Sequence, residues 1–545
     1  MKAAWLPIGL TLLLSGCQAF THVSDSSISV DEDYHRVTKL IPVGNDWYKA
    51  GAENIARKAV TTRAKNVILF VGDGMSLPTI AAARIFAGQQ QGKPGEEHRL
   101  SFENFPYTGL SKTYNTDAQT PDSAGTMTAM MSGVKTRMGI IGQTDSTERG
   151  VCDESATSLV PTALELAEIA GLATGVVTTT RLTHATPSAT YAHASERNWE
   201  DSSDMPAAAT AQGCLDIAQQ LTGFRSLLNT RYGVNVDGPE IMLGGGWRNF
   251  LPEYGSALGK GDRNDGRDLL NEWQQQFPNG QLLTTAAELA AFDPEKDLEN
   301  DRDNDSPVMG VFARSHLPFQ HELTATDSGV PDLVIMTEKA IRKLQQNSDG
   351  FLLIVEAGRI DHAHHVGNAY NALLETVALS DAVERAVELT DVDETLILVT
   401  ADHGHVMTFA GYPKRGNPIL GKVINPGKET PALALDGKPY TTLSYANGMG
   451  QAVREGDDPE ARYEMPVNAG RQDITNIDTE SHSYHQEALV PLYAETHSGE
   501  DVAIYASGPW ASLVSGVHEQ NDIFHIINQA LDLTKRASAK LPSSE

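Results

Sequence analysis

The sequence is short of basic residues, of cysteine and of long apolar runs. It has 42 Lys+Arg against 71 Asp+Glu, a formal net charge of −29, which excludes a broad basic patch for polymeric nucleic acid or an anionic membrane. Its 3 cysteines include no pair with the spacing of a cysteine metal site. Beyond the first residues, no apolar run approaches the roughly 18–20 residues that span a bilayer. Neither a nucleic-acid-binding protein nor a membrane-spanning protein is therefore expected.

Two common catalytic motifs are also missing. GDG at 72–74 lacks the lysine of GxxxxGK[ST] and the spacing of GxGxxG, so it is not a nucleotide-binding loop. GxSxG is absent, which argues against a hydrolase elbow with a Ser-His-Asp triad. The composition, with 40% hydrophobic and 21% charged residues, fits a globular protein of more than one structural unit.

The first 17 residues have the pattern of a targeting segment. Lys2 precedes an apolar stretch, and LSGC (14–17) resembles the box of a bacterial lipoprotein, in which the cysteine is lipidated. We expect an exported protein, periplasmic or anchored to the outer membrane through Cys17, with ordinary secretory cleavage as the alternative. Cys152 and Cys214 remain, and an even pair in an oxidising compartment suggests a disulfide; two free buried thiols are the alternative.

Short apolar runs alternate with helical patterns for most of the length. The runs that predict buried strands are NVILFV (66–71), TGVVTT (174–179), EIMLGG (240–245), FLLIV (351–355), TLILVT (395–400) and VAIYAS (502–507). Helices are expected between them, for example at 161–170, 332–346 and 368–389. This alternation predicts an α/β fold with a doubly wound, mostly parallel central sheet and helices on both faces.

Two regions interrupt this alternation of strand and helix patterns. Residues 262–305 are acidic and predict a solvated excursion; a calcium loop there would lack the spaced glutamate of an EF-hand. Residues 411–480 are rich in Gly, Pro and polar residues. They predict a small inserted domain, because a further strand follows them.

Ionisable side chains, together with one threonine, cluster at the ends of the predicted strands. They are Asp73; His184, Thr186, His193 and Arg197; Glu356, Asp361, His362, His364 and His365; Asp402, His403 and His405; and His497. If the strands are adjacent, these groups converge on one edge of the sheet, where ligands bind in such folds. Asp361 and His365 are four residues apart, so a helix would place both on one face. Asp, Glu and His without Cys suit Zn²⁺, Mn²⁺ or Mg²⁺.

Ser123 is the candidate nucleophile. It follows Asp122 and precedes a helix of small residues, an N-cap position where a serine often only caps the helix. The alternative is a serine activated by a metal, with the helix amides and dipole favouring an anion attached to it.

Six segments, in this order, resemble the alkaline phosphatases. They are GDGMS (72–76), PDSAGTMTAMMSGVKT (121–136), THATPSATYAHASERNW (183–199), EAGRIDHAHH (356–365), TADHGH (400–405) and ETHSGEDVAIYASGP (495–509). The resemblance covers about residues 60–535. It implies hydrolysis of small phosphate monoesters to alcohol and inorganic phosphate through a phosphoserine, and a homodimer. Cys152 and Cys214 fall where the animal-type branch has a disulfide.

The family's site residues carry over by position. Ser123 would be the nucleophile, and Arg197 would bind two phosphate oxygens. Two Zn²⁺ and one Mg²⁺ are implied. The ligands would be Asp361, His365 and His497 for one zinc, Asp73, Asp402, His403 and Ser123 for the second, and Asp73, Thr186 and Glu356 for magnesium. Zinc ions so placed would stabilise the entering and leaving oxygens of a phosphoryl transfer.

The remaining polar positions have weaker expectations. His184 and His362, together with Asp122, would contact water and phosphate rather than metal. Those expected to support ligands or the fold are His193, His364 and His405, while His482 and His485 receive no role. The calcium site of animal enzymes lacks its acidic residue near 311–318, so it is not expected here.

The resemblance also divides the chain. The segments are a signal at 1–17, an N-terminal extension with a helix at 18–60, a catalytic core at 61–405 and 486–537, an inserted crown domain at 406–485, and a tail at 538–545.

Two rival functions stay open at this point. Related metallohydrolases act on phosphodiesters, usually with a threonine nucleophile, or on sulfates, with a modified residue in C/S-x-P-x-R; SAGT (123–126) fits neither. Arg197 favours a dianionic monoester, because a diester lacks one of the oxygens. A lipoprotein that only binds metal or phosphate would not need the nucleophile.

Overall fold

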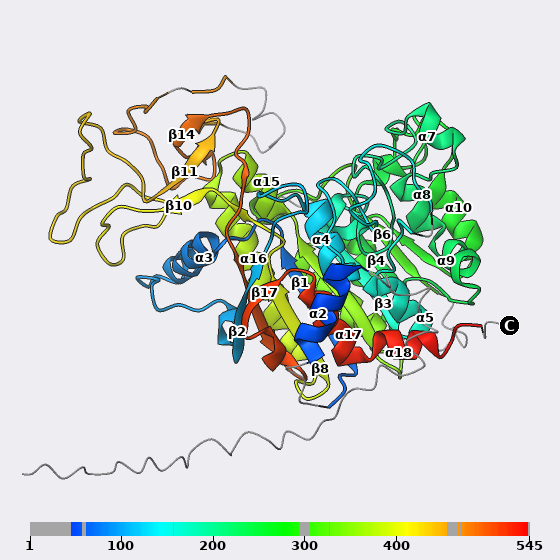
Figure 1. Ribbon diagram of the computed structural model, residues 1–545. Coiled ribbons are helices and arrows are strands. Elements are labelled where there is room, and N and C mark those ends of the chain that lie inside the picture. Colours follow the sequence, from blue (N-terminus) through cyan, green and yellow to red (C-terminus); the bar gives the residue numbers. More distant parts are fainter. Residues whose placement is uncertain are drawn as a thin grey trace, which may run out of the picture.

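A computed structural model describes residues 45–56, 62–155, 157–294, 306–325, 328–454, 466–468 and 470–542. A ten-stranded sheet in the order β17-β2-β16-β8-β1-β7-β3-β4-β6-β5 runs through its centre (Figure 1). The strands are β1 Asn66–Gly72, β2 Tyr107–Lys112, β3 Ala173–Arg181, β4 Ile241–Gly245, β5 Gln281–Leu283, β6 Val308–Val311, β7 Phe351–Ala357, β8 Thr395–Thr400, β16 Val502–Ser507 and β17 Gly516–Glu519. The predicted mostly parallel sheet is confirmed, since only β16 runs antiparallel to its neighbours, β8 and β2.

Helices cover both faces of this sheet. On β1, Val67, Leu69 and Val71 belong to one hydrophobic core, while Ile68 and Phe70 belong to the other. The first core includes side chains from α4 Ser123–Ser132, α5 Ala163–Ala170, α17 Asp522–Leu531 and α18 Leu533–Ser538, and the second from α3 Leu77–Gln90, α14 Leu333–Leu344 and α16 Ala369–Leu389. Because both faces are buried, the central strands are continuous apolar runs, as their sequences indicate.

The direction of β16 could not be foreseen from its sequence. Since it runs against β8, the residues that precede β16 lie at the same edge as those that follow β8. His497, which precedes β16, therefore lies at the same edge as Asp402, which follows β8.

The acidic region 262–305 is a solvated excursion only in part, and the prediction is wrong for residues 269–292. They form α10 Leu269–Gln276, the edge strand β5 and α11 Ala286–Ala291, with Trp273 and Leu289 buried. The charged runs on either side, 262–268 and 293–304, obscured the apolar spacing that anchors these elements. Residues 295–305 lie outside the described residues.

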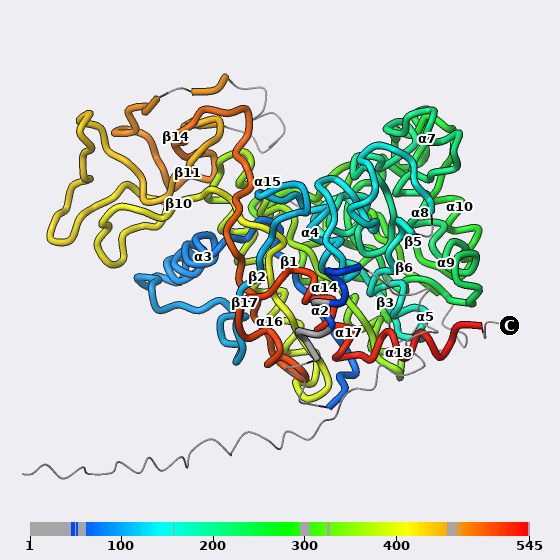
Figure 2. Tube along the Cα trace, viewed as in Figure 1, coloured from blue at the N-terminus to red at the C-terminus, as the bar shows by residue number. Residues whose placement is uncertain are grey.

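A small sheet stands apart from the central one, at the yellow and orange end of Figures 1 and 2. We call it the crown sheet: β10 Met407–Phe409, β11 Leu443–Gly448 and β14 Ala488–Pro491, in that order. Next to it, β12 Ala452–Val453 pairs with β13 Tyr484–His485. The limits 406 and 485 for an inserted domain stay a prediction, while the crown sheet itself extends to residue 491.

The described chain begins next to helix α2 Asp46–Ala56, whose Tyr48 ring lies 4.8 Å from the His525 ring of α17. The predicted signal segment and Cys17 lie outside the described residues. Among those that are described, none of the helices combines the length and apolar character of a membrane span. Further helices are α7 Ala207–Ala211, α8 Ile217–Thr222, α9 Phe224–Tyr232 and α13 Gln320–Ala325.

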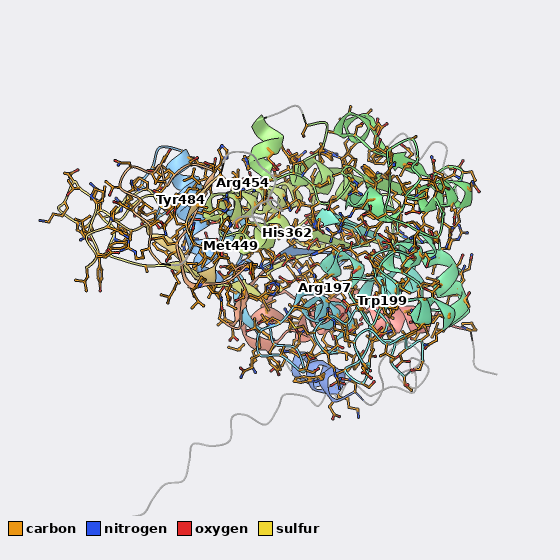
Figure 3. All side chains as sticks on the ribbon, turned by 90° about the horizontal axis from the view of Figure 1, so that it is seen from above. Arg197, Trp199, His362, Met449, Arg454 and Tyr484 are labelled. Carbon is orange, nitrogen blue, oxygen red and sulfur yellow. A yellow bond between two sulfur atoms is a disulfide. The ribbon has the colours of Figure 1, made fainter. Side chains whose placement is uncertain are left out.

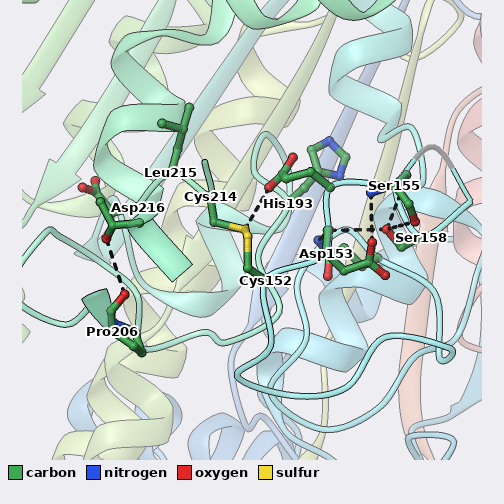
Figure 4. Close-up of a disulfide and its surroundings, with 12 residues drawn as sticks. Cys152, Asp153, Ser155, Ser158, His193, Pro206, Cys214, Leu215 and Asp216 are labelled. Atoms are coloured by element: carbon green, nitrogen blue, oxygen red, sulfur yellow. Dashed lines mark hydrogen bonds between the residues drawn. A yellow bond between two sulfur atoms is a disulfide. The ribbon is translucent and has the colours of Figure 1, made fainter. Parts of the chain in front are cut away.

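Cys152 and Cys214 form a disulfide with an S–S distance of 2.08 Å (Figure 4). The expected pairing is confirmed, and the alternative of two free thiols is excluded. Trp199 packs against the bridge, two residues after Arg197. The disulfide therefore braces the segment that carries a predicted phosphate-binding residue.

Two carboxylates are buried at the amino ends of β3 and β4. Thr174 N donates to Glu240 Oε2 at 2.6 Å, and Thr174 Oγ1 donates to Glu168 Oε1 at 2.5 Å. Burial, followed by the charge of Asp237, raises the pKa of Glu240 from 4.5 to about 8. Between these two values the folded protein binds more protons than the unfolded chain, so this residue lowers the stability as pH rises through that window.

Glu240→Gln should remove this contribution. Relative to wild type, its unfolding midpoint should rise progressively as the pH is raised from about 5 to about 8. Thermal or urea unfolding at several pH values measures the difference. Glu253→Gln, at an exposed glutamate, is the control and should change little. Parallel profiles for wild type and Glu240→Gln would contradict the role of this carboxyl.

Candidate metal and phosphate site

The predicted site residues gather at the carboxyl edge of four adjacent strands, β8, β1, β7 and β3. Val71 of β1 lies opposite both Thr400 of β8 and Glu356 of β7. Asp73 comes just after β1, and Asp402 just after β8. The register of the sheet therefore brings these three carboxylates to one place.

The first group of ligand-type side chains is built on α15 Arg359–His365, directly after β7. Asp361 and His365 are one turn apart, with 3.3 Å between Oδ1 and Nε2. His497 Nε2 lies 3.3 Å from the same Asp361 oxygen and 3.1 Å from His365 Nε2. The structure thus brings these three predicted residues together.

Asp73, Asp402 and His403 form a second group beside Ser123. His403 Nε2 lies 3.4 Å from Asp73 Oδ1 and 3.3 Å from Asp402 Oδ2. Ser123 Oγ is 3.2 Å from the same nitrogen. All four side chains are buried, so any charge they carry must be compensated locally.

Ser123 is not the N-cap of its helix. Helix α4 begins at Ser123, and the cap is Asp122, whose Oδ1 accepts from Gly125 N at 3.1 Å. Both residue types cap helices well, and here the aspartate takes the position. The capping role considered for Ser123 is therefore wrong, and its hydroxyl contacts His403 instead.

Glu356, Thr186 and Asp73 form a third group. Thr186, on α6 Ala185–Ser188, donates from Oγ1 to Asp73 Oδ2 at 3.4 Å. Glu356 Oε2 accepts from threonine hydroxyls of β3. Within the described residues, Glu356 Oε1 and Asp73 Oδ1 are buried and have no hydrogen-bond donor. Such acceptors fit a cation, and oxygen donors are those that Mg²⁺ prefers.

The pKa values show how strongly these carboxylates interact. Burial, and then the charges of Asp402, Asp361 and Glu356, raise the pKa of Asp73 well above its usual range. Burial raises the pKa of Glu356 to about 7. Burial also opposes ionisation of Asp361, yet its histidine neighbours hold its pKa well below the usual range. A divalent cation would favour the ionised form of each carboxylate.

Arg197 lies beside the start of α4. Its Nη1 donates to Asp122 Oδ2 at 3.0 Å, and its Nη2 is 3.4 Å from His184 Nε2. Asp122 therefore caps α4 and also orients the guanidinium. Seen from above, Arg197 and His362 lie between Met449 on the crown side and Trp199 (Figure 3).

Three histidine rings lie together here, and one of them, His184, contacts Arg197. The His184 ring centroid lies 5.5 Å from that of His362 and 5.3 Å from that of His316, and the last two are 4.2 Å apart. Burial lowers the pKa of all three. His316 received no role from the sequence, since it is a single histidine in an irregular segment.

His184 was expected to contact water and phosphate, but it also lies close to two of the buried carboxylates. Its ligand nitrogen lies within 4.8 Å of oxygens of Asp73 and Glu356, and Asp73 and Glu356 lie equally close to each other. The three residues therefore have the spacing of a metal site.

His405 is also closer to the candidate ligands than expected. Its Nε2 lies 2.7 Å from Asp361 Oδ1, and its Nδ1 lies 2.5 Å from Glu495 Oε2. Burial favours the neutral ring, but the carboxylates of Glu495 and Asp361 raise the pKa of His405 to about 10. With Asp361, His365 and His497 it has the spacing of a metal site. Glu495 opens the segment ETHSGEDVAIYASGP (495–509), but no role was expected for it from the sequence.

The other predicted histidines contact the fold around the site. His364 Nε2 is 3.0 Å from Thr79 Oγ1, and His193 Nδ1 is 2.6 Å from Gly142 O. His485 Nδ1 is 2.7 Å from Val366 O, and His482 is exposed.

Comparisons with known proteins agree on one family. The family model described as alkaline phosphatase matches residues 64–533. The tissue-nonspecific isozyme of alkaline phosphatase from Homo sapiens is 40% identical over 485 residues, 87% of this chain and 85% of that protein. The alkaline phosphatase of Gadus morhua is 39% identical over 501 residues, 89% of this chain and 96% of that protein.

Solved structures share the fold. Alkaline phosphatase from the Antarctic bacterium TAB5 superposes with a TM-score of 0.56 at 22% identity, covering 87% of this chain and 99% of that one. The Thermus thermophilus enzyme gives a TM-score of 0.59 at 24% identity, over 88% and 96% of the two chains.

Removing metal should lower the stability of the folded protein. Without cations, Asp73, Asp361, Asp402 and Glu356 repel one another in a buried space, so EDTA should lower the unfolding midpoint by several degrees. Added Zn²⁺ and Mg²⁺ should restore it. Asp73→Asn has one carboxylate fewer, so EDTA should lower its unfolding midpoint by less than that of the wild type. Equal midpoints for wild type with and without EDTA would contradict the assignment.

Proposed function

The chain belongs to the alkaline phosphatase family and hydrolyses phosphate monoesters, and we propose that it does so through a phosphoserine on Ser123. The observation that carries this proposal is the Ser123 hydroxyl, which does not cap its helix and lies 3.2 Å from His403 Nε2. As the first residue of α4, it occupies the end of the helix where the dipole favours an attached anion.

We propose two Zn²⁺ and one Mg²⁺ as cofactors. The residues that would hold them are Asp361, His365 and His497 for one zinc, Asp73, Asp402, His403 and Ser123 for the other, and Asp73, Thr186 and Glu356 for magnesium. Support comes from ligand atoms that are nitrogen and oxygen without sulfur, and from two buried acceptors, Asp73 Oδ1 and Glu356 Oε1, that have no donor within the described part of the chain. When bound, the cations supply Lewis-acid polarisation and offset negative charge on the transferring group.

The residues of the chain account for two successive displacements. First, Ser123 Oγ loses its proton to solvent and bonds to phosphorus, the ester P–O bond breaks, and the alcohol leaves with a proton from solvent. A water oxygen then bonds to phosphorus and gives up a proton, the Oγ–P bond breaks, Ser123 Oγ regains a proton, and inorganic phosphate leaves. Arg197 would bind two phosphoryl oxygens throughout, with its guanidinium held by Asp122 at 3.0 Å.

Small phosphate monoesters are the substrate class that this arrangement favours. A monoester presents enough free oxygens for the Arg197 fork and the cations together, whereas a diester has one fewer. Arg197 also gives an anion a local positive group in a protein whose formal net charge is −29.

Export and anchoring are further proposals. The targeting pattern of residues 1–17 supports export, with a lipid on Cys17 as the anchor in the periplasm or at the outer membrane. The Cys152–Cys214 disulfide supports an oxidising compartment.

We also propose a homodimer that buries the edge of the crown sheet. Strand β14 is the last strand of that sheet, so its outer edge is unpaired within it. At β14 and just after it, Leu489 is 83% exposed and Tyr493 82% exposed. An apolar sheet edge of this kind is usually covered by a partner.

Ser123→Ala should abolish turnover of an aryl phosphate monoester, by about a thousandfold or more, because the nucleophile is gone. Acid-quenched wild-type enzyme should retain labelled phosphate from the substrate, and the variant should retain none. Ser132→Ala is the control on the same helix, since that hydroxyl bonds to Thr128 O at 2.7 Å.

Two results would count against the proposal. Undiminished turnover by Ser123→Ala would exclude the phosphoserine. Faster hydrolysis of an aryl diester or an aryl sulfate than of the monoester would overturn the substrate class.

Tyr493→Asp should shift the protein from dimer towards monomer, because it places a charge in the proposed apolar contact. Sedimentation velocity over a range of protein concentrations measures the shift. Tyr254→Asp, at a tyrosine of the catalytic core that is 72% exposed, is the control and should leave the association unchanged. A monomeric wild type would refute the dimer.

A further inference from the structure

Glu495 is a buried carboxylate between the crown sheet and the candidate metal ligands. It follows β14 by four residues and precedes His497 by two, and it is 1% exposed. Its Oε1 accepts from Val406 N at 2.8 Å, and its Oε2 lies 2.5 Å from His405 Nδ1. Both oxygens therefore have fixed partners.

The backbone of Glu495 holds a second histidine. Glu495 N donates to His365 O at 3.0 Å, and His365 Nδ1 lies 2.6 Å from Glu495 O. A carbonyl oxygen only accepts, so His365 carries its proton on Nδ1 and leaves Nε2 to face Asp361 and His497. This is the tautomer that binds a metal through Nε2.

The side chain of Glu495 acts at longer range through His405. A carboxylate accepts hydrogen bonds from a histidine N–H, and the His405 ring bridges two carboxylates, with its Nε2 2.7 Å from Asp361 Oδ1. Glu495 therefore fixes the His405 ring, and the His405 ring in turn orients the Asp361 carboxylate. Partners of metal ligands that are arranged in this way tune the affinity of the site.

We propose that Glu495 is a positioning residue for the zinc site of Asp361, His365 and His497, and that the crown sheet holds Glu495 in place. The inference rests on the proposed metal site and adds two components to it: a carboxylate outside the ligand set and a structural support from the inserted region.

The support comes from β11 of the crown sheet. Asn447 Nδ2 donates to Thr496 Oγ1 at 2.9 Å, and Thr496 N donates to Asn447 Oδ1 at 3.0 Å. At the next residue, Gly448, an added Cβ would lie 3.3 Å from Glu495 Cβ, so the backbone approaches closely.

Strand β11 also contacts His364, whose ring stacks on that of His405. Tyr445 Oη lies 2.8 Å from His364 Nδ1, and the His364 ring stacks on the His405 ring with 4.9 Å between centroids. The crown sheet thus constrains both the segment that carries Glu495 and the ring that Glu495 orients.

Glu495→Gln tests the inference, because it keeps the size of the side chain and removes its charge. We expect the affinity for zinc to fall about 10–100-fold, as for other partners of metal ligands. Competition with a chromophoric chelator measures this affinity on the full-length protein. The visible absorption of the Co²⁺-substituted protein should also change, since it reports the geometry of the ligands.

Two further variants separate positioning from general damage to the fold. Glu487→Gln is the matched control, since that carboxylate lies in the same region but bonds to Arg471 Nε at 3.2 Å. It should leave zinc affinity, Co²⁺ absorption and kcat unchanged. Asn447→Ala removes the support from β11 and should weaken zinc binding in the same direction as Glu495→Gln.

The outcomes distinguish this inference from the proposed function. If wild type binds zinc that Asp361→Ala loses, and Glu495→Gln binds it as tightly with the same Co²⁺ spectrum, the positioning role is overturned and the phosphatase site stands. If wild type has no zinc that depends on Asp361, the proposed metal site fails and the inference fails with it. Weaker binding by Glu495→Gln and Asn447→Ala, but not by Glu487→Gln, supports the inference.

Discussion

Repulsion between buried carboxylates is the constraint on which the centre of this protein depends. Asp73, Asp361, Asp402 and Glu356 are all buried at one edge of the sheet. Because they are buried, bulk solvent weakens their mutual repulsion little, so the surrounding fold must hold them against it. Parallel strands in fixed register, each buried on both faces, provide that rigidity. The two hydrophobic cores are therefore as necessary to the site as the ligands themselves.

Positive side chains of the protein compensate some of the carboxylates at this site. His405 contacts Asp361, and Arg197 contacts Asp122, so each of these carboxylates has a partner within the protein. Among the residues that the structure describes, none donates a hydrogen bond to Asp73 Oδ1 or to Glu356 Oε1, where a cation would be held. The backbone around Arg197 is fixed from both sides, by Gly139 O, which accepts from Arg197 N at 2.8 Å, and by the disulfide next to Trp199.

Much of this architecture could be predicted from local patterns. Alternating apolar runs indicate the sheet, and the four-residue spacing of Asp361 and His365 indicates their shared helix face. Features that depend on distant partners could not be predicted. The residues of β16 do not determine the direction in which it runs. Asp122 and Ser123 are both good helix caps, so their sequence does not show which of them caps α4. Helix α10 has one charged residue, Glu272, but it directly follows the charged run 262–268, which favoured the prediction of a solvated excursion.

Single polar residues in loops were the hardest to assign. His316 and Glu495 have no periodic neighbours that mark them, and only the folded chain shows what they contact. His405 was recognised as a supporting residue, but its two carboxylate partners come from segments 44 and 90 residues away. A sequence alone does not show such pairings.

The short bridge between β9 Gly404–His405 and β15 His497–Ser498 has a consequence for how this enzyme can change. His405 lies opposite His497 in that bridge, so the chain leaves the catalytic core and returns to it at adjacent points. The entropy cost of closing a loop grows only with the logarithm of its length. The length of the stretch between these points can therefore change at little entropic cost, provided that Glu495 and its supports on β11 are retained. Apart from β11 and Glu495, the crown is thus a part of the molecule whose length can vary without displacing the ligands.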